Sequence, residues 1–325
     1  MPVVLDHKKV FKRYLDLPTE LRMMIIYEMQ TIERCIFTQC SSQSQKEALA
    51  SKNFLYQLEI GGTFNFIVIF VLHTETSGYF IRFFQEEPGT IRMIYYSYYD
   101  KVALWSRELP CSIDWVQYVI QLFKNMLQHY QNTIKSLVLE GPHIEAYLKE
   151  NDFELRSLNR LEQLDISADI DASLFFSKIK HPLKTLCSWS YENHEYLKNS
   201  EQMYSVSNVL YSPHLQLNNA QFLQLSAAKI TIDIGELTPQ NILNFIKSWQ
   251  NGTLRDNFRS CTWNLRASEF DKDKLFEVFG IDDWYSGYIA TTIKPSKKDE
   301  KISKLVYFIR KNVLHFEVNV DEEQQ

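Results

Sequence analysis

The chain has 325 residues, of which 45% are hydrophobic and 14% aromatic, with only 9 glycines and 9 prolines. This composition supports one large domain or two to three smaller ones, and it argues against a disordered or collagen-like chain. The net charge of −5 argues against a broad phosphate-binding surface, so nucleic acid is not expected as the main partner.

The cysteines and the apolar runs indicate in which cellular compartment the protein resides. The cysteines are odd in number and form no CxxC pair, which fits reduced thiols acting as small core residues. They are Cys35, Cys40, Cys111, Cys187 and Cys261. The N-terminal residues are too charged for a secretory signal, and the most apolar run, residues 64–72, is too short to cross a bilayer as a helix. We therefore expect a soluble intracellular protein of the cytoplasm, the nucleus or both, with no membrane partner.

Residues 13–52 read as short helices, with Pro18 at a position where a first helical turn tolerates proline. In the helix that follows, apolar side chains fall on nearly every side, interrupted mainly by Arg22 and Glu28. A helix that is apolar all round is expected to be buried all round. Packing against the rest of the chain accounts for one apolar side of this helix but not for two.

The pattern changes to strands between residues 54 and 105. Four runs rich in aromatic and β-branched residues are separated by turns that contain glycine or proline, which predicts an antiparallel meander. Residues 112–130 then return to helical spacing, with apolar side chains from Ile113 to Leu127 along one side.

Short apolar segments recur after residue 130. With Leu137, Leu164, Leu186, Val209 and Ile230 as markers, the intervals are 27, 22, 23 and 21 residues. Repeats of this length with strand-like cores are typical of leucine-rich-repeat solenoids, in which neighbouring repeats stack into a parallel sheet. The repeats are degenerate and lack the regular Asn or Cys of the standard motif, so ordinary α/β packing stays open as the alternative.

The clearest helix covers residues 237–252. Thr238 is a good N-cap, Pro239 stands at the first helical position and Gly252 closes the helix. Three strand-like runs follow between residues 287 and 320. The sequence therefore predicts a mixed fold, α+β or α/β, with a small helical head, a β-meander, a degenerate leucine-rich-repeat-like region and C-terminal strands.

Local motifs for catalysis are missing from the sequence. Glycine is scarce and forms no phosphate loop, and no GxSxG elbow is present. His194 and Glu195 begin a metalloprotease-like string, but Lys198 stands where the second zinc ligand would be needed. We therefore expect no cofactor, no metal and no catalytic residue, although spacing alone leaves a Cys–His nucleophile pair open.

The N-terminal segment resembles the F-box, the helical motif by which substrate receptors dock onto a Skp-type adaptor of a cullin–RING ubiquitin ligase. The likeness rests on Leu17-Pro18, on the apolar positions that follow, and on Cys40-Ser41, which matches the nematode version. Most of the basic residues that usually follow this pair are replaced here by "SQSQK". The resemblance implies an adaptor-binding surface made by Leu17, Pro18, Leu21, Ile25, Ile26, Met29, Ile36 and Phe37.

The second half resembles the type 2 F-box-associated domain found in nematodes, in which a strand leads into a Leu-Thr pair and a helix ending in Phe-x-x-x-Trp-x-x-Gly. The matching residues, expected to be structural, are Leu237, Thr238, Phe245, Trp249 and Gly252. Phe316 and Val318 fit a late strand of that family, although its usual closing Trp is absent. The likeness covers most of the chain from residue 54 onward and is strongest at residues 205–265.

Together the two resemblances imply a non-catalytic substrate-recognition subunit of a Skp–cullin–F-box ubiquitin ligase. Residues 13–52 would be the F-box, 54–130 a β-rich segment with a helix, and 131–320 the F-box-associated domain. That domain would bind a protein substrate through residues that the sequence does not identify. The alternative is a leucine-rich-repeat-like scaffold that binds a protein without recruiting a ligase. An enzyme would require a concave site with converging polar groups.

Overall fold

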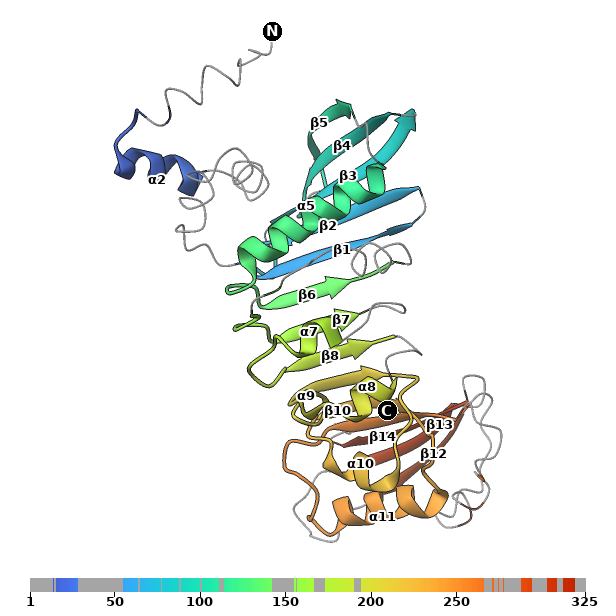
Figure 1. The fold of residues 1–325 in the computed structure, drawn as a ribbon. Coiled ribbons are helices and arrows are strands. Elements are labelled where there is room, and N and C mark those ends of the chain that lie inside the picture. The colour runs from blue at the N-terminus through green and yellow to red at the C-terminus, as the bar shows by residue number, and fades with distance from the viewer. Residues whose placement is uncertain are drawn as a thin grey trace.

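The structure is a computed structural model. It describes residues 14, 16–28, 55–63, 65–76, 78–87, 89–99, 101–110, 114–141, 155, 157–166, 173–189, 194–265, 271, 274, 277, 288–293, 303–308 and 312–318. Fourteen strands within these ranges form one mixed sheet, in the order β12-β13-β14-β11-β10-β9-β8-β7-β6-β1-β2-β3-β4-β5. Figure 1 shows this sheet running from its edge strand β5 at the top to its other edge strand β12 at the lower right.

The first five strands form the predicted antiparallel meander. They are β1 (Gln57–Thr63), β2 (Phe66–Leu72), β3 (Gly78–Glu87), β4 (Thr90–Ser97) and β5 (Ala103–Pro110). Burial alternates along β2, β3 and β4, because aromatic and β-branched residues on one face enter the core. The fifth strand was not predicted. Leu104, Ser106 and Arg107 are all exposed along it, so its sequence carries no alternation.

Strand β1 continues directly into a parallel array. It pairs with β6 (Ser136–Leu139), and the array goes on through β7 (Gln163–Ile166), β8 (Thr185–Ser188), β9 (Val209–Ser212), β10 (Lys229–Asp233) and β11 (Ser260–Asn264). Each strand pairs with the next one along the chain from β6 to β11. The predicted recurrence of strand-like cores is therefore confirmed as a parallel array, with one strand in each interval.

The register of the array corrects one of the repeat markers. Leu137 pairs with Leu164, and Leu164 pairs with Leu186, as the spacing predicted. Leu186, however, pairs with Leu210, while Val209 is half-buried and pairs with Thr185. A one-residue slip moves a side chain to the other face of a sheet, so Leu210 is the true equivalent. Leu210 in turn pairs with Ile230.

The three predicted C-terminal strands are present, and they are antiparallel. β14 (Val313–Val318) pairs with β11 and with β13 (Ser303–Phe308), and β13 pairs with β12 (Tyr288–Ile293). Phe316 of β14 is fully buried beside Cys261 of β11. These strands therefore extend the same sheet.

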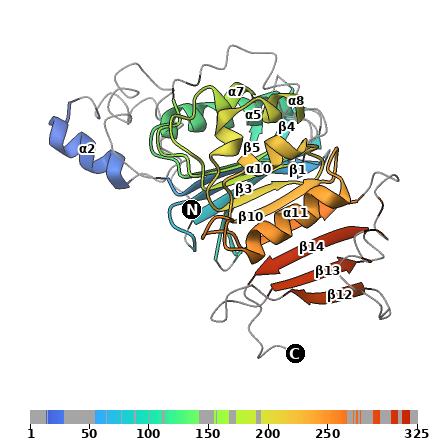
Figure 2. The same ribbon diagram turned by 90° about the horizontal axis from the view of Figure 1, so that it is seen from below.

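The helices after β5 lie on one face of the sheet, as Figures 1 and 2 show. They are α5 (Trp115–Tyr130), α7 (Ser173–Phe176), α8 (His194–Lys198), α9 (Glu201–Tyr204), α10 (Asn219–Gln224) and α11 (Pro239–Gln250). Helix α5 confirms the helical spacing predicted for residues 112–130, and its buried side chains cover the meander. In the described part of the chain, no helix is long and apolar enough to cross a membrane.

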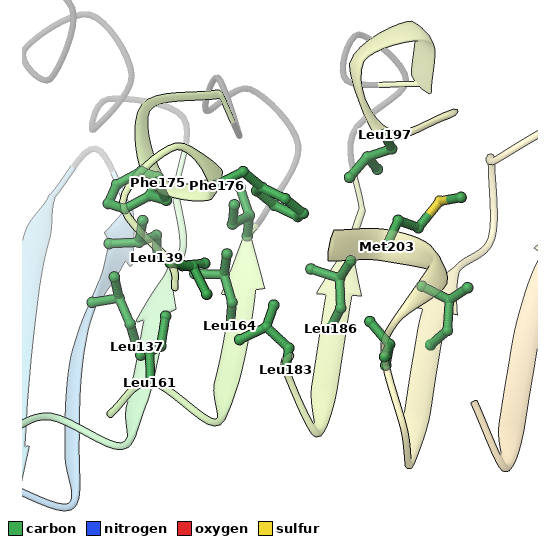
Figure 3. Packing of buried hydrophobic residues seen from close by; sticks show 14 of the residues in the cluster. Leu137, Leu139, Leu161, Leu164, Phe175, Phe176, Leu183, Leu186, Leu197 and Met203 are labelled. Atoms are coloured by element: carbon green, nitrogen blue, oxygen red, sulfur yellow. The ribbon is translucent and has the colours of Figure 1, made fainter. Parts of the chain in front are cut away.

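The main core fills the space between these helices and the sheet. Figure 3 shows leucines of successive parallel strands, among them Leu137, Leu164 and Leu186, beneath the side chains of Phe175 and Met203. All five side chains are fully buried. Full burial of an aliphatic side chain stabilises the fold by about 1.5–3 kcal/mol, so a row of such residues joins each strand to the next.

The fold is thus a mixed α and β architecture with one large mixed sheet and few helices. Leu58 of β1 lies beside Leu137 of β6, and both belong to a single core cluster. The sheet therefore runs without interruption across the segment boundary expected near residue 130.

Candidate interaction surfaces

Helix α2 (Thr19–Glu28) begins directly after Leu17 and Pro18. The guanidinium of Arg22 donates hydrogen bonds to the Leu17 carbonyl at 2.8 Å and to Thr19 Oγ1 at 3.2 Å. The backbone N–H of Arg22 donates to the Pro18 carbonyl at 3.1 Å. The Leu-Pro segment and the first helical turn are therefore held together as one unit.

One side of α2 packs in a small apolar cluster, separate from the main core among the residues described. Ile26 is fully buried in this cluster and Tyr14 is nearly so, and Leu17 and Met23 pack against them. Met23 and Ile26 are three residues apart, so they share a side of the helix.

The other side of α2 exposes large apolar side chains. Leu21 is 46% exposed, Met24 is 62% exposed and Ile25 is 38% exposed. Their spacing of three and four residues places them on one stripe, and Pro18 is exposed at the start of the helix. We refer to Pro18, Leu21, Met24 and Ile25 as the α2 stripe. Contiguous exposed apolar side chains of this kind are typical of surfaces that bind another protein.

The α2 stripe overlaps with the residues expected to bind an adaptor but is not identical to them. Three of those residues lie outside the described part of the chain, namely Met29, Ile36 and Phe37. Of the other five, three are exposed, Leu17 is half-buried and Ile26 is buried, so Ile26 belongs to the packing of the helix itself. Met24 was not expected, although its position three residues after Leu21 is a signal that the sequence carries.

The residues matched to the F-box-associated motif lie around α11. Thr238 is the N-cap: its Oγ1 accepts from the Asn241 N–H at 3.3 Å, and Asn241 Oδ1 accepts from the Thr238 N–H at 2.9 Å. Leu237 and Phe245 are buried, and Trp249 contacts Phe316 edge-on with ring centroids 5.5 Å apart. Gly252 follows the helix at φ +67°, a backbone conformation that favours glycine. These residues hold α11 on the sheet.

A second candidate surface is the face of the sheet opposite the helices, which we call the helix-free face. Strand pairing places one side chain from each of eight adjacent strands side by side on it. We call this set the cross-strand row, and it contains Tyr96, Phe80, Phe70, Glu59, Val138, Asp165, Cys187 and Tyr211, in the order β4, β3, β2, β1, β6, β7, β8 and β9. The row is aromatic at β4 to β2 and acidic at β1 and β7.

The aromatic half of the row is a packed set of half-buried rings. The ring centroids of Phe70 and Phe80 are 5.2 Å apart, and those of Phe80 and Tyr96 are 4.6 Å apart in a stacked arrangement. Next to them the guanidinium of Arg82 lies 4.3 Å from the centre of the Phe66 ring. Each such contact contributes about 0.5–1.5 kcal/mol beyond area burial, so the rings support one another although the face is open to solvent.

The acidic half brings three carboxylates together. Burial raises the pKa of Glu59 to about 7, with further contributions from Glu140 and Asp165, while the hydrogen bond from Gln57 at 2.8 Å opposes the change. Burial and the Glu140 carboxylate likewise raise the pKa of Asp165 to about 6. Within the described ranges no Lys or Arg forms an ion pair with any of the three carboxylates.

Aromatic side chains also border the acidic half. Trp189 follows β8 and is 45% exposed, and its ring centroid lies 4.6 Å from that of Tyr211. The neighbouring Trp189 and Cys187 lower the pKa of the Asp165 carboxyl and oppose the effect of burial. Aromatic rings thus flank the carboxylates of Glu59, Glu140 and Asp165 along the row. Those of β2 to β4 lie on one side of the carboxylates, and Trp189 and Tyr211 lie on the other.

Neither of the two cysteines that the structure describes, Cys187 and Cys261, has an activated thiol. Burial raises the pKa of the Cys187 thiol to about 12, with Asp165 adding to it, and raises the pKa of Cys261 strongly. Both thiols are therefore protonated near neutral pH and are poor nucleophiles. Nδ1 of His315 lies 2.8 Å from Thr262 Oγ1. No group of three or more metal-ligating side chains occurs among the residues that the structure describes.

The helix-free face could not be assembled from the sequence alone. Phe80, Glu59 and Asp165 are far apart along the chain, and only the strand register makes them neighbours. A local signal does exist, because polar residues alternate with buried leucines in "QLEI" and "QLDI". No known protein-family model matches this sequence, and no curated protein or solved structure is significantly similar to it.

Proposed function

We propose that this chain is the substrate-recognition subunit of a Skp–cullin–F-box ubiquitin ligase. In this role α2 contacts a Skp-type adaptor, and the sheet-containing part of the chain, with its leucine-rich-repeat-like parallel array, binds a protein substrate. The chain contributes no covalent chemistry, because a receptor acts by holding the substrate near a ubiquitin-loaded partner and raising its effective concentration.

The observation that carries this proposal is the α2 stripe. Ile26 already packs on its own apolar cluster, yet Leu21, Met24 and Ile25 are exposed on the other side of the same ten-residue helix. An apolar helix side that the described part of the chain leaves in solvent is best accounted for by insertion into a hydrophobic groove of a partner. The F-box resemblance identifies that partner as a Skp-type adaptor.

The test is co-purification of the full chain with a co-expressed Skp-type adaptor. Leu21→Glu combined with Ile25→Glu should reduce the recovered adaptor by about tenfold or more, because central apolar anchors dominate such interfaces. These two residues are chosen because they are exposed, whereas Leu17 packs against Tyr14 and Ile26 and its loss would also loosen the helix.

The matched control is Leu223→Glu. Leu223 is 55% exposed on α10, so its replacement adds a charge to another exposed apolar position. It should leave adaptor recovery unchanged. Equal recovery with the wild type and the double variant, or no adaptor with the wild type, would refute the proposal.

The alternative is a protein-binding scaffold that recruits no ligase. The parallel array and the open helix-free face favour a protein-binding role under either proposal. The two differ in the adaptor, since a scaffold purifies as a monodisperse monomer and captures no ligase subunit.

A further inference from the structure

We propose that the helix-free face binds an extended polypeptide segment in which a lysine or arginine is flanked by aromatic or aliphatic side chains. The identification of this segment as a ligase substrate rests on the proposed function. The binding itself involves only the cross-strand row and its neighbours, and it can be measured without an adaptor.

The aromatic half of the row supplies the apolar contacts. Phe70, Phe80 and Tyr96 are half-buried, with Phe80 stacked on Tyr96 and tilted against Phe70, so their rings are held in place before any ligand arrives. Rigid aromatic side chains bind with little loss of conformational entropy, which is why they are enriched at interface anchors. Val68 and Ile94 lie on the same face one step along β2 and β4, on either side of Arg82, whose guanidinium lies over the Phe66 ring.

The acidic half determines the charge of the ligand. Glu59, Glu140 and Asp165 repel one another, and no described Lys or Arg forms an ion pair with them. A cation from a partner would offset this repulsion and form charge-assisted hydrogen bonds. The raised pKa values of Glu59 and Asp165 agree with a site that lacks a positive charge of its own.

Trp189 and Tyr211 make the acidic half suitable for an amino-acid cation. Their rings lie 4.6 Å apart, tilted by 49°, and Trp189 is close enough to Asp165 to lower the pKa of that carboxyl. An aromatic face beside a carboxylate can contact both the apolar stem and the charged head of a lysine or arginine side chain.

The dimensions of the row fit a short peptide. From Tyr96 on β4 to Asp165 on β7 the row crosses six adjacent strands. At about 4.8 Å between neighbouring strands this is a span of about 24 Å. An extended chain rises about 3.3 Å per residue, so roughly seven residues cover the span.

Two other occupants fit less well. Nucleic acid phosphates would be repelled by the three carboxylates. A second copy of this chain, in a two-fold dimer centred on the acidic half, would place that half against itself. A polypeptide with an alternating cationic and apolar pattern meets neither obstacle.

The test is fluorescence anisotropy with the full chain and a labelled twelve-residue peptide in which two lysines alternate with phenylalanines. One matched peptide carries glutamate in place of lysine, and another carries serine in place of phenylalanine. The lysine–phenylalanine peptide should bind at least about tenfold more tightly than either, since each matched peptide loses either the charge-assisted hydrogen bonds or the aromatic contacts.

Two variants locate the binding on the helix-free face. Glu59→Gln with Asp165→Asn keeps the side-chain shapes, and Phe80→Ala removes the central ring; each should weaken peptide binding by about tenfold. The control is Glu201→Gln with Leu223→Ala, which alters exposed residues on α9 and α10 and should change binding by less than about twofold.

Equal affinity for the lysine and glutamate peptides, or unchanged binding by both face variants, would overturn the inference. So would concentration-dependent dimerisation of the wild type that the Glu59→Gln, Asp165→Asn variant abolishes, because the occupant would then be a second copy. Adaptor co-purification is measured on the same proteins. Adaptor binding without peptide binding refutes this inference alone, and peptide binding without adaptor binding refutes only the ligase role.

Discussion

The ionisation of single carboxyl groups links the helix-free face to stability. The pKa of Glu59 rises from 4.5 to about 7 in the folded chain, so the folded state holds its proton more tightly than the unfolded state. Protonated Glu59 therefore makes its full contribution to the free energy of unfolding below pH 4.5, and this contribution is lost as the pH rises through about 7. Ionised Glu59 thus destabilises the fold at pH 8.

Glu59→Gln should remove this loss. We expect the variant to exceed the wild type in free energy of unfolding by about 1–2 kcal/mol at pH 8, after allowance for solvent screening, and to match it near pH 4. Urea denaturation at the two pH values measures the difference. Glu87→Gln, at an exposed site at the end of β3, is the control and should show no dependence on pH. A Glu59→Gln effect of equal size at both pH values would contradict the role of ionisation.

Two buried hydroxyls on the helix-covered face of the sheet lead to a second prediction about single residues. Oγ of Ser188 and Oγ of Ser212 are buried with no hydrogen-bond partner among the described residues. Burying an unpaired hydroxyl costs about 1–3 kcal/mol. Ser212→Ala should therefore raise the free energy of unfolding by about 0.5–1 kcal/mol, while the exposed control Ser207→Ala should have no effect. A loss of stability in Ser212→Ala would indicate that the hydroxyl is bonded.

At the scale of elements, the ends of α11 carry a stability prediction. Thr238→Ala removes the reciprocal hydrogen bonds of the N-cap and should lower the free energy of unfolding by about 0.5–2 kcal/mol. Gly252→Ala should cost about 1–2 kcal/mol through backbone strain alone, because no atom lies within 4 Å of the added Cβ. Glu236→Ala, exposed just before the helix, is the control for thermal unfolding. A neutral Thr238→Ala would show that packing alone sets this helix end.

The elements that were predicted well are those with local signals. Thr238, Pro239 and Gly252 mark the ends of α11 through chemistry that acts within a few residues, and the helix spans Pro239–Gln250 as expected. Strand β5 was missed because its described side chains, among them Leu104, Ser106 and Arg107, are exposed on both faces of the sheet, so no alternation marks it. Val209 was chosen as a marker because it is apolar, and only pairing with β8 shows that Leu210 occupies the core position.

For the whole molecule, the joining of β1 to β6 predicts that the meander and the parallel array are coupled. Leu58→Ala should lower the free energy of unfolding by about 2–5 kcal/mol, since Leu58 is fully buried beside Leu137. Hydrogen exchange should accelerate in β6 as well as in β2, because β1 pairs with both strands. An acceleration confined to β1–β5 would show that the meander unfolds as a separate unit. Leu223→Ala, exposed on α10, should change neither measurement.

The candidate surfaces differ in how far the sequence could predict them. The α2 stripe depends on spacing within ten residues, so most of it was expected; the structure adds Met24 and assigns Ile26, with Leu17 packed against it, to the inner side. The cross-strand row depends on the register of eight strands that span residues 57–212, which no local pattern specifies. Its aromatic and acidic residues looked like ordinary strand and surface residues until the sheet brought them together.

The most direct test of the receptor account is a calorimetric titration of the purified chain with a purified Skp-type adaptor at several temperatures. We predict saturable binding with a negative heat-capacity change, because the α2 stripe leaves water on binding. Leu21→Glu with Ile25→Glu should abolish the heat of binding, while Glu59→Gln with Asp165→Asn should leave it unchanged. Absence of wild-type binding, or binding that the α2 double variant retains in full, would contradict the account.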